Sequence, residues 1–456
     1  MDLIRLVNYI RLEIKSGNLK PDVSSKALFE DDKYLKPVLE DDAVLFSLDD
    51  ALGEDGSSLV LSEVEKLREQ LALLQAQFSA YREDVQKAMS AKMAEKIPKN
   101  EVTAAGSSSK AKRAELSQDP DYFNSYSYNS IHEIMIKDKV RTDAYRDFIY
   151  DNKDIFKDKI VLDVGCGTGI LSMFCAKAGA KLVLAVDNSD IINKARENVF
   201  RNDLQDKITC IQGKIEDVTL PVLQVDIIVS EWMGYCLLYE SMLDSVIHAR
   251  DKYLAPDGLM APSHTTLRIA PLADSELIAS HVDFWRDIYG FNMTSMLEKI
   301  HEEALTRVVD AKELAADSAT FYELDLHTVT VKDLEFCQPF EVTWKEGFER
   351  LEGFIIWFDI FFMRDRGEEL QKGLEVTTAK KRGIVAFSTG PQSLPTHWQQ
   401  CVLMIKDQRD AMVAGEVISG HVAYRKKEGQ ERSIDVDVDW KMSKTGKVEH
   451  QTWFLD

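Results

Sequence analysis

The sequence predicts a protein of the α/β class, in which a doubly wound, mostly parallel sheet is followed by an antiparallel β domain. From about residue 155 to 262, short apolar runs alternate with helical patterns, which is typical of a parallel sheet covered by helices. After Pro262 apolar runs follow one another with few helical patterns between them, which favours a sandwich or barrel. The 456 residues have room for roughly three domains.

Residues 1–117 precede the predicted sheet and divide into three parts by composition. Residues 1–60 begin with an amphipathic pattern and become acidic, so we expect an N-terminal helical extension with an acidic appendage. Residues 61–95 repeat apolar side chains in alternating steps of three and four, which indicates a coiled coil or an amphipathic helix docked on its own chain. Residues 96–117 are rich in small polar side chains and are predicted to be a flexible linker.

The predicted strands of the rest of the chain fall into two groups. In the parallel sheet they are 160–164, 181–187, 207–211 and 226–230. In the second domain they are 265–270, 328–331, 340–344, 353–362, 398–405, 415–424 and 433–440, with a helical insertion at about 273–314.

Glycines at alternate positions, Gly165, Gly167 and Gly169, join the first predicted strand to a helical pattern. Glycine is needed where a tight turn presses its backbone against a ligand or takes a positive φ. The dinucleotide fingerprint fits poorly, because its third glycine would fall on Ile170. Asp187 ends the second strand, where a carboxylate can accept hydrogen bonds from both ribose hydroxyls. The pattern predicts a nucleoside-type cofactor, with a purely structural turn as the alternative.

The chain is acidic, with 77 Asp and Glu against 56 Lys and Arg and a formal net charge of −21. Nucleic acid is an unexpected direct ligand, because phosphate binding favours a basic face. A basic protein partner fits the charge, although acidity also serves solubility. Six cysteines without a Cys-x-x-Cys pair are typical of reduced intracellular thiols. Because a signal peptide and a membrane-spanning run are also not apparent, we expect a cytoplasmic protein with no membrane association, and an additional nuclear location stays open.

Two glutamates, Glu231 and Glu240, bracket an almost wholly apolar and aromatic loop after the fourth predicted strand. Burying carboxylates in such a loop is costly unless a cation compensates them. A guanidinium has five N–H donors in a planar fork, so two carboxylates could hold it while aromatic rings cover its faces. The alternative is structural, with Glu240 at a helix N-terminus and Glu231 exposed to solvent.

Five segments together resemble the motifs of type I protein arginine methyltransferases: 122–126, 132–135, 161–169, 230–235 and 396–398. The resemblance covers about 115 to 456. It implies a Rossmann-like, S-adenosylmethionine-dependent methyltransferase domain at 118–262, beginning with a lid. It also implies a β-barrel substrate domain at 263–456, whose helical arm at about 273–314 forms a homodimer.

Residues 34–42 further resemble the members of this family that carry an N-terminal C2H2 zinc finger. In this chain no cysteine precedes Cys166 and no histidine precedes His132. We therefore expect the finger to be absent and no metal to be bound, because no ligand set exists.

The resemblance implies roles for individual residues. S-adenosyl-L-methionine would be held by Tyr126, His132, Met135, Arg141, Asp163, Gly165, Gly167, Asp187, Ile215, Glu216 and Glu231. The substrate would be bound by Tyr122, Tyr126, Met135, Glu231, Met233, Glu240 and Trp398. Catalysis would rest on Glu231 and Glu240, with His397 and Asp138 as partners in a proton relay.

The implied activity is methylation of Arg-Gly-rich basic proteins, and a small-subunit ribosomal protein is the substrate that the resemblance suggests. Met135 corresponds to the position where the type I pattern leaves room for a second methyl group on the same nitrogen. Monomethyl and asymmetric dimethylarginine are therefore the expected products. Two other functions stay open at this point: a small-molecule methyltransferase, which needs no paired glutamates, and a catalytically silent coiled-coil adaptor.

Overall fold

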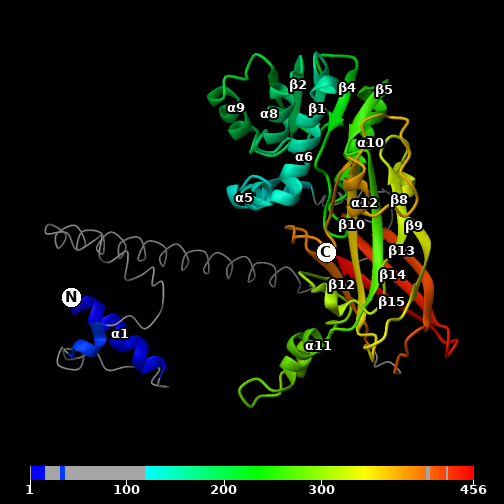
Figure 1. The fold of residues 1–456 in the computed structure, drawn as a ribbon. Coiled ribbons are helices and arrows are strands. Elements are labelled where there is room, and N and C mark those ends of the chain that lie inside the picture. Colours follow the sequence, from blue (N-terminus) through cyan, green and yellow to red (C-terminus); the bar gives the residue numbers. More distant parts are fainter. Residues whose placement is uncertain (1, 16–30, 36–118, 407–410, 428–429, 456) are drawn as a thin grey trace, which may run out of the picture. The chain divides into compact units, whose positions relative to one another are not determined.

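The computed structural model describes residues 2–15, 31–35, 119–406, 411–427 and 430–455 (Figure 1). The chain divides into two compact units, Met1–Ala111 and Lys112–Asp456. The predicted coiled coil at 61–95, the predicted linker at 96–117 and most of 1–60 lie outside the described residues. The predicted boundaries of these three parts therefore stay predictions.

The described part of the first unit is a helix and a short 3-10 turn. These are α1 (Asp2–Lys15) and η2 (Asp32–Leu35). The side chain of Asn8 donates a hydrogen bond to the carbonyl of Tyr34 at 2.9 Å, and the rings of Tyr9 and Tyr34 meet edge to face at 5.4 Å. The amphipathic pattern at the start of the chain thus forms the predicted helix.

The second unit begins with a five-stranded sheet in the order β3-β2-β1-β4-β5, in which every neighbouring pair is parallel. The strands are β1 (Ile160–Val164), β2 (Leu182–Asp187), β3 (Ile208–Gln212), β4 (Val225–Val229) and β5 (Leu254–Ala261). The helices are α4 (Asp119–Ser125), α5 (Asn129–Lys137), α6 (Lys139–Asp151), α7 (Lys153–Phe156), α8 (Ile170–Lys177), α9 (Ile192–Arg201) and α10 (Met242–Tyr253). This arrangement confirms the Rossmann-like fold class predicted for the first domain.

The strand order reverses between β1 and β4, which makes this pair the switch point where open parallel sheets bind ligands. The glycine turn follows β1, and Glu231 lies just beyond β4, so both meet at the carboxyl edge of the sheet. The hydroxyl of Ser230 donates to the carbonyl of Val164 at 2.8 Å and holds the two strand ends together.

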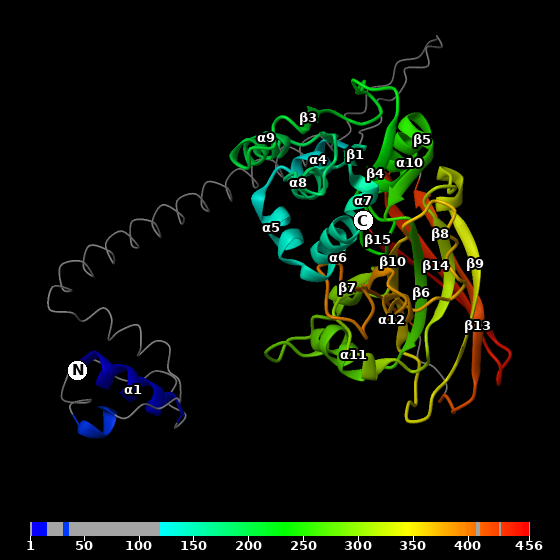
Figure 2. The same cartoon turned by 45° about the horizontal axis from the view of Figure 1, so that its top comes forward.

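The rest of the second unit is a barrel-like β domain made of two antiparallel sheets (Figures 1 and 2). One contains β7 (Leu305–Arg307), β12 (Gln400–Met404), β10 (Gly353–Phe362), β6 (His264–Leu272), β8 (Ala319–Asp325) and β11 (Val385–Ser388). The other contains β15 (Val448–Leu455), β14 (Gln430–Met442), β13 (Val417–Lys427) and β9 (Phe336–Thr343). Isolated bridges between Glu303 and Phe454 and between Ala316 and Trp344 connect their edges. The predicted β-barrel domain is thus confirmed.

A mostly irregular segment leaves the barrel after β6 and projects from it in both views (Figures 1 and 2). It contains α11 (Ser275–His281) and the 3-10 turns η3 (Asp283–Arg286), η4 (Thr294–Leu297) and η5 (Ala311–Glu313). Two further short helices, η6 (Val331–Leu334) and α12 (Val376–Lys381), lie elsewhere in the domain. No described helix is both long and apolar enough to cross a membrane.

The strand predicted at 328–331 is wrong. Asp325 binds the hydroxyl of Thr328 at 2.9 Å, and Thr330 and Asp333 form a capping box that begins η6. These local side-chain bonds outweigh the β-propensity of the Thr-Val-Thr-Val run. The strands β5, β7, β8, β11 and β15 were not predicted.

Candidate active site

A cavity opens at the carboxyl edge of the parallel sheet, between the sheet, the helices α4 and α5, and the barrel. Its volume is about 1330 Å³ including the open mouth. The predicted site residues that line it are Tyr122, Tyr126, His132, Met135, Arg141, Gly165, Gly167, Asp187, Ile215, Glu216, Glu231, Met233, Glu240, His397 and Trp398. Two predicted residues, Asp138 and Asp163, are not among its lining residues.

The glycine-turn half of the cavity comprises Gly165, Gly167, Asp187, Ile215 and Glu216. Gly165 and Gly167 have φ values of +72° and +53°, which side chains rarely tolerate. A Cβ atom on Gly167 would also lie 3.3 Å from the ring of His132. The turn is therefore left-handed and closely covered, as the glycine spacing predicts.

Asp187 ends β2 and holds the turn through its carboxylate. The backbone N–H of Gly167 donates to one oxygen at 2.8 Å, and the backbone and hydroxyl of Ser189 donate to the other at 2.8 and 2.6 Å. Farther along the wall, Glu216 accepts a hydrogen bond from the hydroxyl of Ser245 at 2.6 Å. Two carboxylates thus face one elongated space from successive strand ends.

Asp163, which was predicted to bind the cofactor, lies beneath the glycine turn and is not among the lining residues of the cavity. Its side chain is fully buried and accepts a hydrogen bond from Ser172 at 2.6 Å. Burial raises the pKa of this carboxyl to about 7. Its contacts are those of a residue that supports the turn from behind.

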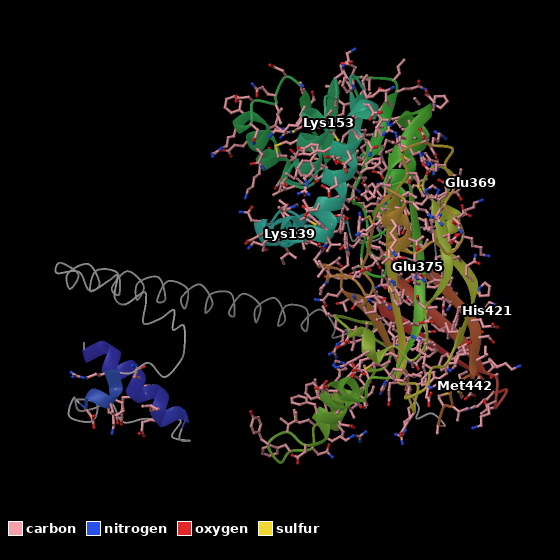
Figure 3. All side chains as sticks on the ribbon, viewed as in Figure 1. Lys139, Lys153, Glu369, Glu375, His421 and Met442 are labelled. Carbon is pink, nitrogen blue, oxygen red and sulfur yellow. The ribbon has the colours of Figure 1, made fainter. Side chains whose placement is uncertain are left out.

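The glutamate half of the cavity comprises Glu231 and Glu240 with Tyr122 and Tyr126. Arg141, in the first turn of α6, donates to one oxygen of Glu231 through Nε at 2.9 Å and Nη2 at 2.7 Å. Both side chains of this ion pair are more than nine-tenths buried. Figure 3 labels Lys139, the first residue of α6, and Lys153, just beyond its other end. The Arg141–Glu231 ion pair fixes Glu231 at the boundary between the glycine-turn half and the glutamate half of the cavity.

Glu240 has an unusual backbone and an unusual carboxyl group. Its φ is +74°, in the left-handed region that costs a non-glycine residue about 1–3 kcal/mol. The Tyr126 hydroxyl donates to its carboxylate at 2.8 Å. Burial, opposed in part by that bond and reinforced by the charge of Glu231, raises the pKa of Glu240 to about 7. The alternative in which Glu240 only caps a helix is therefore not supported by its position.

His397 and Asp138 form a pair at the edge of the cavity. Nδ1 of His397 lies 2.7 Å from the Asp138 carboxylate, which also accepts the His397 backbone N–H at 2.9 Å. Burial would raise the pKa of Asp138, but these hydrogen bonds outweigh it and lower that pKa. The neighbouring indole of Trp398 donates to the carbonyl of Met233 at 2.8 Å and joins the barrel to the glutamate loop.

Arg432 is a lining residue that was not predicted, and it enters the cavity from β14 of the barrel. Its guanidinium carbon lies 3.7 Å from the centre of the Tyr122 ring. It is 192 residues from Glu240, whose carbonyl it binds, and its local sequence has no motif that indicates this contact. The strand β14, which carries it, pairs with β13 and β15 in the barrel.

The two halves together can do two chemical tasks. The glycine-turn half presents carboxylates and a close backbone to a nucleoside-like ligand. The glutamate half presents two carboxylates, covered by tyrosines, to a planar cation. Among the described residues, no cluster of three or more His, Cys, Asp or Glu side chains has the arrangement of a metal site.

Three family models match the chain. The model described as a methyltransferase domain matches residues 161–258, and the arginine methyltransferase oligomerization subdomain matches residues 263–445. The C2H2 zinc finger domain of protein arginine N-methyltransferase 3 matches residues 2–37.

The match at 2–37 corrects the expectation that this zinc-finger domain is absent. The matched segment includes α1 and η2, so a region related to that domain is present. It contains neither cysteine nor histidine, and it therefore lacks the side chains that ligate zinc in a C2H2 finger.

Known proteins resemble the chain over most of its length. The ribosomal protein arginine N-methyltransferase rmt3 of Schizosaccharomyces pombe is 42% identical, over 99% of this chain and 82% of the relative. Protein arginine N-methyltransferase 1 of the same yeast is 46% identical, over 74% of this chain and 93% of the relative. The solved Trypanosoma brucei PRMT1 enzyme-prozyme heterotetrameric complex with AdoHcy has a TM-score of 0.66 and 35% identity, covering 73% of this chain and all of that one. The chain belongs to the protein arginine N-methyltransferases.

Proposed function

We propose that this arginine N-methyltransferase is of type I and converts arginine in Arg-Gly-rich proteins to monomethyl and then asymmetric dimethylarginine. The observation that supports this most strongly is the placement of Glu231 and Glu240 in one cavity with Tyr126. Two buried carboxylates beside aromatic rings match the charge and shape of a guanidinium.

The methyl donor is S-adenosyl-L-methionine, and the glycine-turn half fits it. The positive φ values of Gly165 and Gly167 disfavour side chains at these positions, and the bare turn allows a ligand to approach the backbone. Asp187 would accept hydrogen bonds from the ribose hydroxyls, and Glu216 would accept one from the adenine amine beside Ile215. Arg141 would bind the methionine carboxylate. His132 covers the turn, and Tyr126 and Met135 close the space from the lid.

When bound, S-adenosyl-L-methionine supplies an electrophilic methyl group on a sulfonium. Glu231 and Glu240 hold the substrate guanidinium, localise its positive charge on one nitrogen and align the other. Holding the reactants in this geometry contributes about 7 kcal/mol or more to lowering the barrier. Tyr122, Met233 and Trp398 line the space around the substrate and limit its motion and its contact with water.

The methylated guanidinium must lose a proton before it can react again. We assign this proton to the His397–Asp138 pair, because His397 lines the cavity and Asp138 is the carboxylate that orients its ring. The lowered pKa of Asp138 keeps that carboxylate ionised, so it stabilises the imidazolium that forms.

The type I product rests on Met135, which lines the cavity from α5. An unbranched, flexible side chain there can move away from a nitrogen that already carries one methyl group. We therefore propose that the second methyl group is added to the same nitrogen.

The proposed substrates are basic proteins, which the net charge of −21 attracts. The name of the S. pombe relative, ribosomal protein arginine N-methyltransferase, supports a ribosomal protein as the substrate. A small-subunit ribosomal protein and a cytoplasmic location stay predictions.

A homodimer through the projecting arm is also proposed. Phe284, Tyr289 and Phe291 are 53%, 98% and 70% exposed on this arm, an unusual exposure for three aromatic side chains. The match to an oligomerization subdomain at 263–445 supports the same assignment. Light scattering should give a dimer for the wild-type chain and a monomer for Phe291→Asp.

Mass spectrometry of an Arg-Gly-rich peptide after reaction tests the type I proposal. Fragmentation should show neutral loss of dimethylamine, which identifies asymmetric dimethylarginine. Loss of monomethylamine from a dimethylated residue would contradict the argument from Met135. A monomethylated end product would contradict it as well.

A further inference from the structure

Arg432 binds the loop that carries Glu231 and Glu240, and the proposed reaction gives this arginine no role. Its Nη1 donates to the carbonyl of Glu240 at 2.6 Å, and the backbone N–H of Glu240 donates to the carbonyl of Arg432 at 2.8 Å. One residue of the barrel therefore binds both main-chain polar groups of Glu240.

This contact lies where the loop needs support. Glu240 and Ser241 are consecutive non-glycine residues with φ values of +74° and +55°. Such a backbone persists only when its surroundings impose it. The barrel also holds the following residues, since the Ser241 hydroxyl donates to the carbonyl of Glu431 at 2.5 Å and Lys426 pairs with Asp244.

The Arg432 guanidinium also contacts the lid, through Tyr122 of α4. It stacks on the Tyr122 ring at 3.7 Å, and the rings of Tyr122 and Tyr126 lie 5.1 Å apart. The hydroxyl of Tyr126 then donates to the Glu240 carboxylate at 2.8 Å. Arg432, Tyr122 and Tyr126 are thus joined by contacts that begin at the Glu240 backbone and end at the Glu240 side chain.

The positive charge of Arg432 also acts on the carboxyl group of Glu240. The titratable and charged groups that face Glu240 include Tyr122 and Tyr126 from α4 and the turn after it, Glu231 and Tyr235 from its own loop, and Arg432 from β14. Burial and the charge of Glu231 raise the pKa of Glu240, while the hydrogen bonds of the tyrosines and the charge of Arg432 lower it, and the net pKa is about 7. Loss of Arg432 should therefore make Glu240 harder to ionise.

We propose that Arg432 is a positioning residue for methyl transfer, which fixes Glu240 through its main chain and ties the α4 lid to the barrel. The inference rests on the proposed role of Glu240. Arg432 acts through Glu240 and Tyr122, and so it should affect turnover more than cofactor binding.

The test is Arg432→Met, which keeps a long side chain but removes the charge, the planar stacking face and the donors. With an Arg-Gly-rich peptide, kcat should fall about 10- to 100-fold, the range expected when a catalytic group is misplaced by up to ~1 Å. The acidic limb of kcat/KM should move to higher pH by about one unit. Affinity for S-adenosylhomocysteine, measured by calorimetry, should stay within about twofold of the wild-type value, well below the tenfold that 1.4 kcal/mol represents.

The matched control is Lys441→Met on the same strand. Lys441 is exposed and lies beside Met442, which Figure 3 labels at the far end of the barrel from Lys139. Nine residues of strand separate it from Arg432, about 30 Å. This variant should keep the wild-type kcat and pH profile.

Arg432→Lys provides a second test if the methionine variant does not fold. A lysine keeps the charge but has no planar face, so kcat should fall at least about threefold with little change in the pH profile. Wild-type kcat in Arg432→Lys, or in a folded Arg432→Met with an unshifted pH profile, would overturn the inference. Because wild-type methylation of the peptide is measured first, failure of the proposed function would be recognised separately.

Discussion

The glycine-turn half of the cavity is built from neighbouring strands of one sheet, whereas the glutamate half is assembled from three distant parts of the chain. Gly167 and Asp187 are 20 residues apart and joined by one hydrogen bond. Glu240 depends on Tyr126, 114 residues away, and on Arg432, 192 residues away. The first half should therefore tolerate changes elsewhere in the molecule, while the second should depend on the lid, the sheet and the barrel together.

Glu231→Gln should have the largest effect, because Glu231 lies between the two halves. Methyl transfer should fall by about 10³-fold, as expected when a group that stabilises transition-state charge is removed. Arg141 would be left buried without its counter-charge, which should lower the free energy of unfolding by about 3–5 kcal/mol. Single-turnover kinetics and thermal unfolding measure the two effects.

Glu197→Gln is the matched control for Glu231→Gln, since Glu197 is exposed and pairs across one turn of α9 with Arg201. Its activity and stability should be unchanged. A rate of methyl transfer near the wild-type value in Glu231→Gln would contradict a catalytic role for the glutamate half.

Asp187→Ala should damage the glycine-turn half alone. Affinity for S-adenosylhomocysteine should fall about 10- to 100-fold, because hydrogen bonds to a charged group contribute about 1.5–3 kcal/mol. At saturating cofactor, kcat should return to within a few-fold of the wild-type value. Calorimetry gives the affinity, with Asp206→Ala at an exposed position as the control. If kcat stays low at saturating cofactor, the change in the glycine-turn half must also disturb the glutamate half, which would contradict their independence.

The pH dependence should report on the glutamate half. Glu240 must be ionised to hold a guanidinium, and its pKa in the free protein is raised to about 7. Below that pH the neutral form predominates, so kcat/KM should rise about tenfold per pH unit and level off above about 7. A profile that is flat between pH 5.5 and 8 would show that Glu240 does not control the reaction.

Asp163→Asn should have the smallest effect and tests whether Asp163 contacts the cofactor directly. The pKa of this buried carboxyl is raised to about 7, so the neutral form, which asparagine resembles, is already well populated near neutral pH. Affinity for S-adenosylhomocysteine should change by less than about threefold, a cost of less than ~0.7 kcal/mol. A loss above tenfold would return Asp163 to the set of direct cofactor ligands.

The sequence predicted the features that local chemistry determines. The bounds of β1 and β10 agree with the predicted strands, and the alternating glycines do form a left-handed turn. These elements are continuous apolar runs or glycine patterns, whose structure depends little on distant contacts.

The features that the sequence did not predict depend on tertiary contacts. The strand β15 is polar over much of its length and is stabilised by its pairing with β14. Arg432 resembles any surface arginine until the barrel brings it to Glu240. The burial of Asp163 beneath the turn, not beside a ligand, likewise follows from the packing of α8, which supplies Ser172.

The most direct test of the separation between the two halves is a calorimetric titration of Glu240→Gln with S-adenosylhomocysteine, on protein whose loss of methyl transfer has been verified. Glutamine can still accept the hydrogen bond from Tyr126, so the variant removes the charge with little change of shape. Glu341→Gln, at an exposed position on β9, is the control. We predict an affinity within about twofold of the wild-type value, well inside the tenfold that 1.4 kcal/mol represents. Loss of cofactor binding together with methyl transfer would contradict the account.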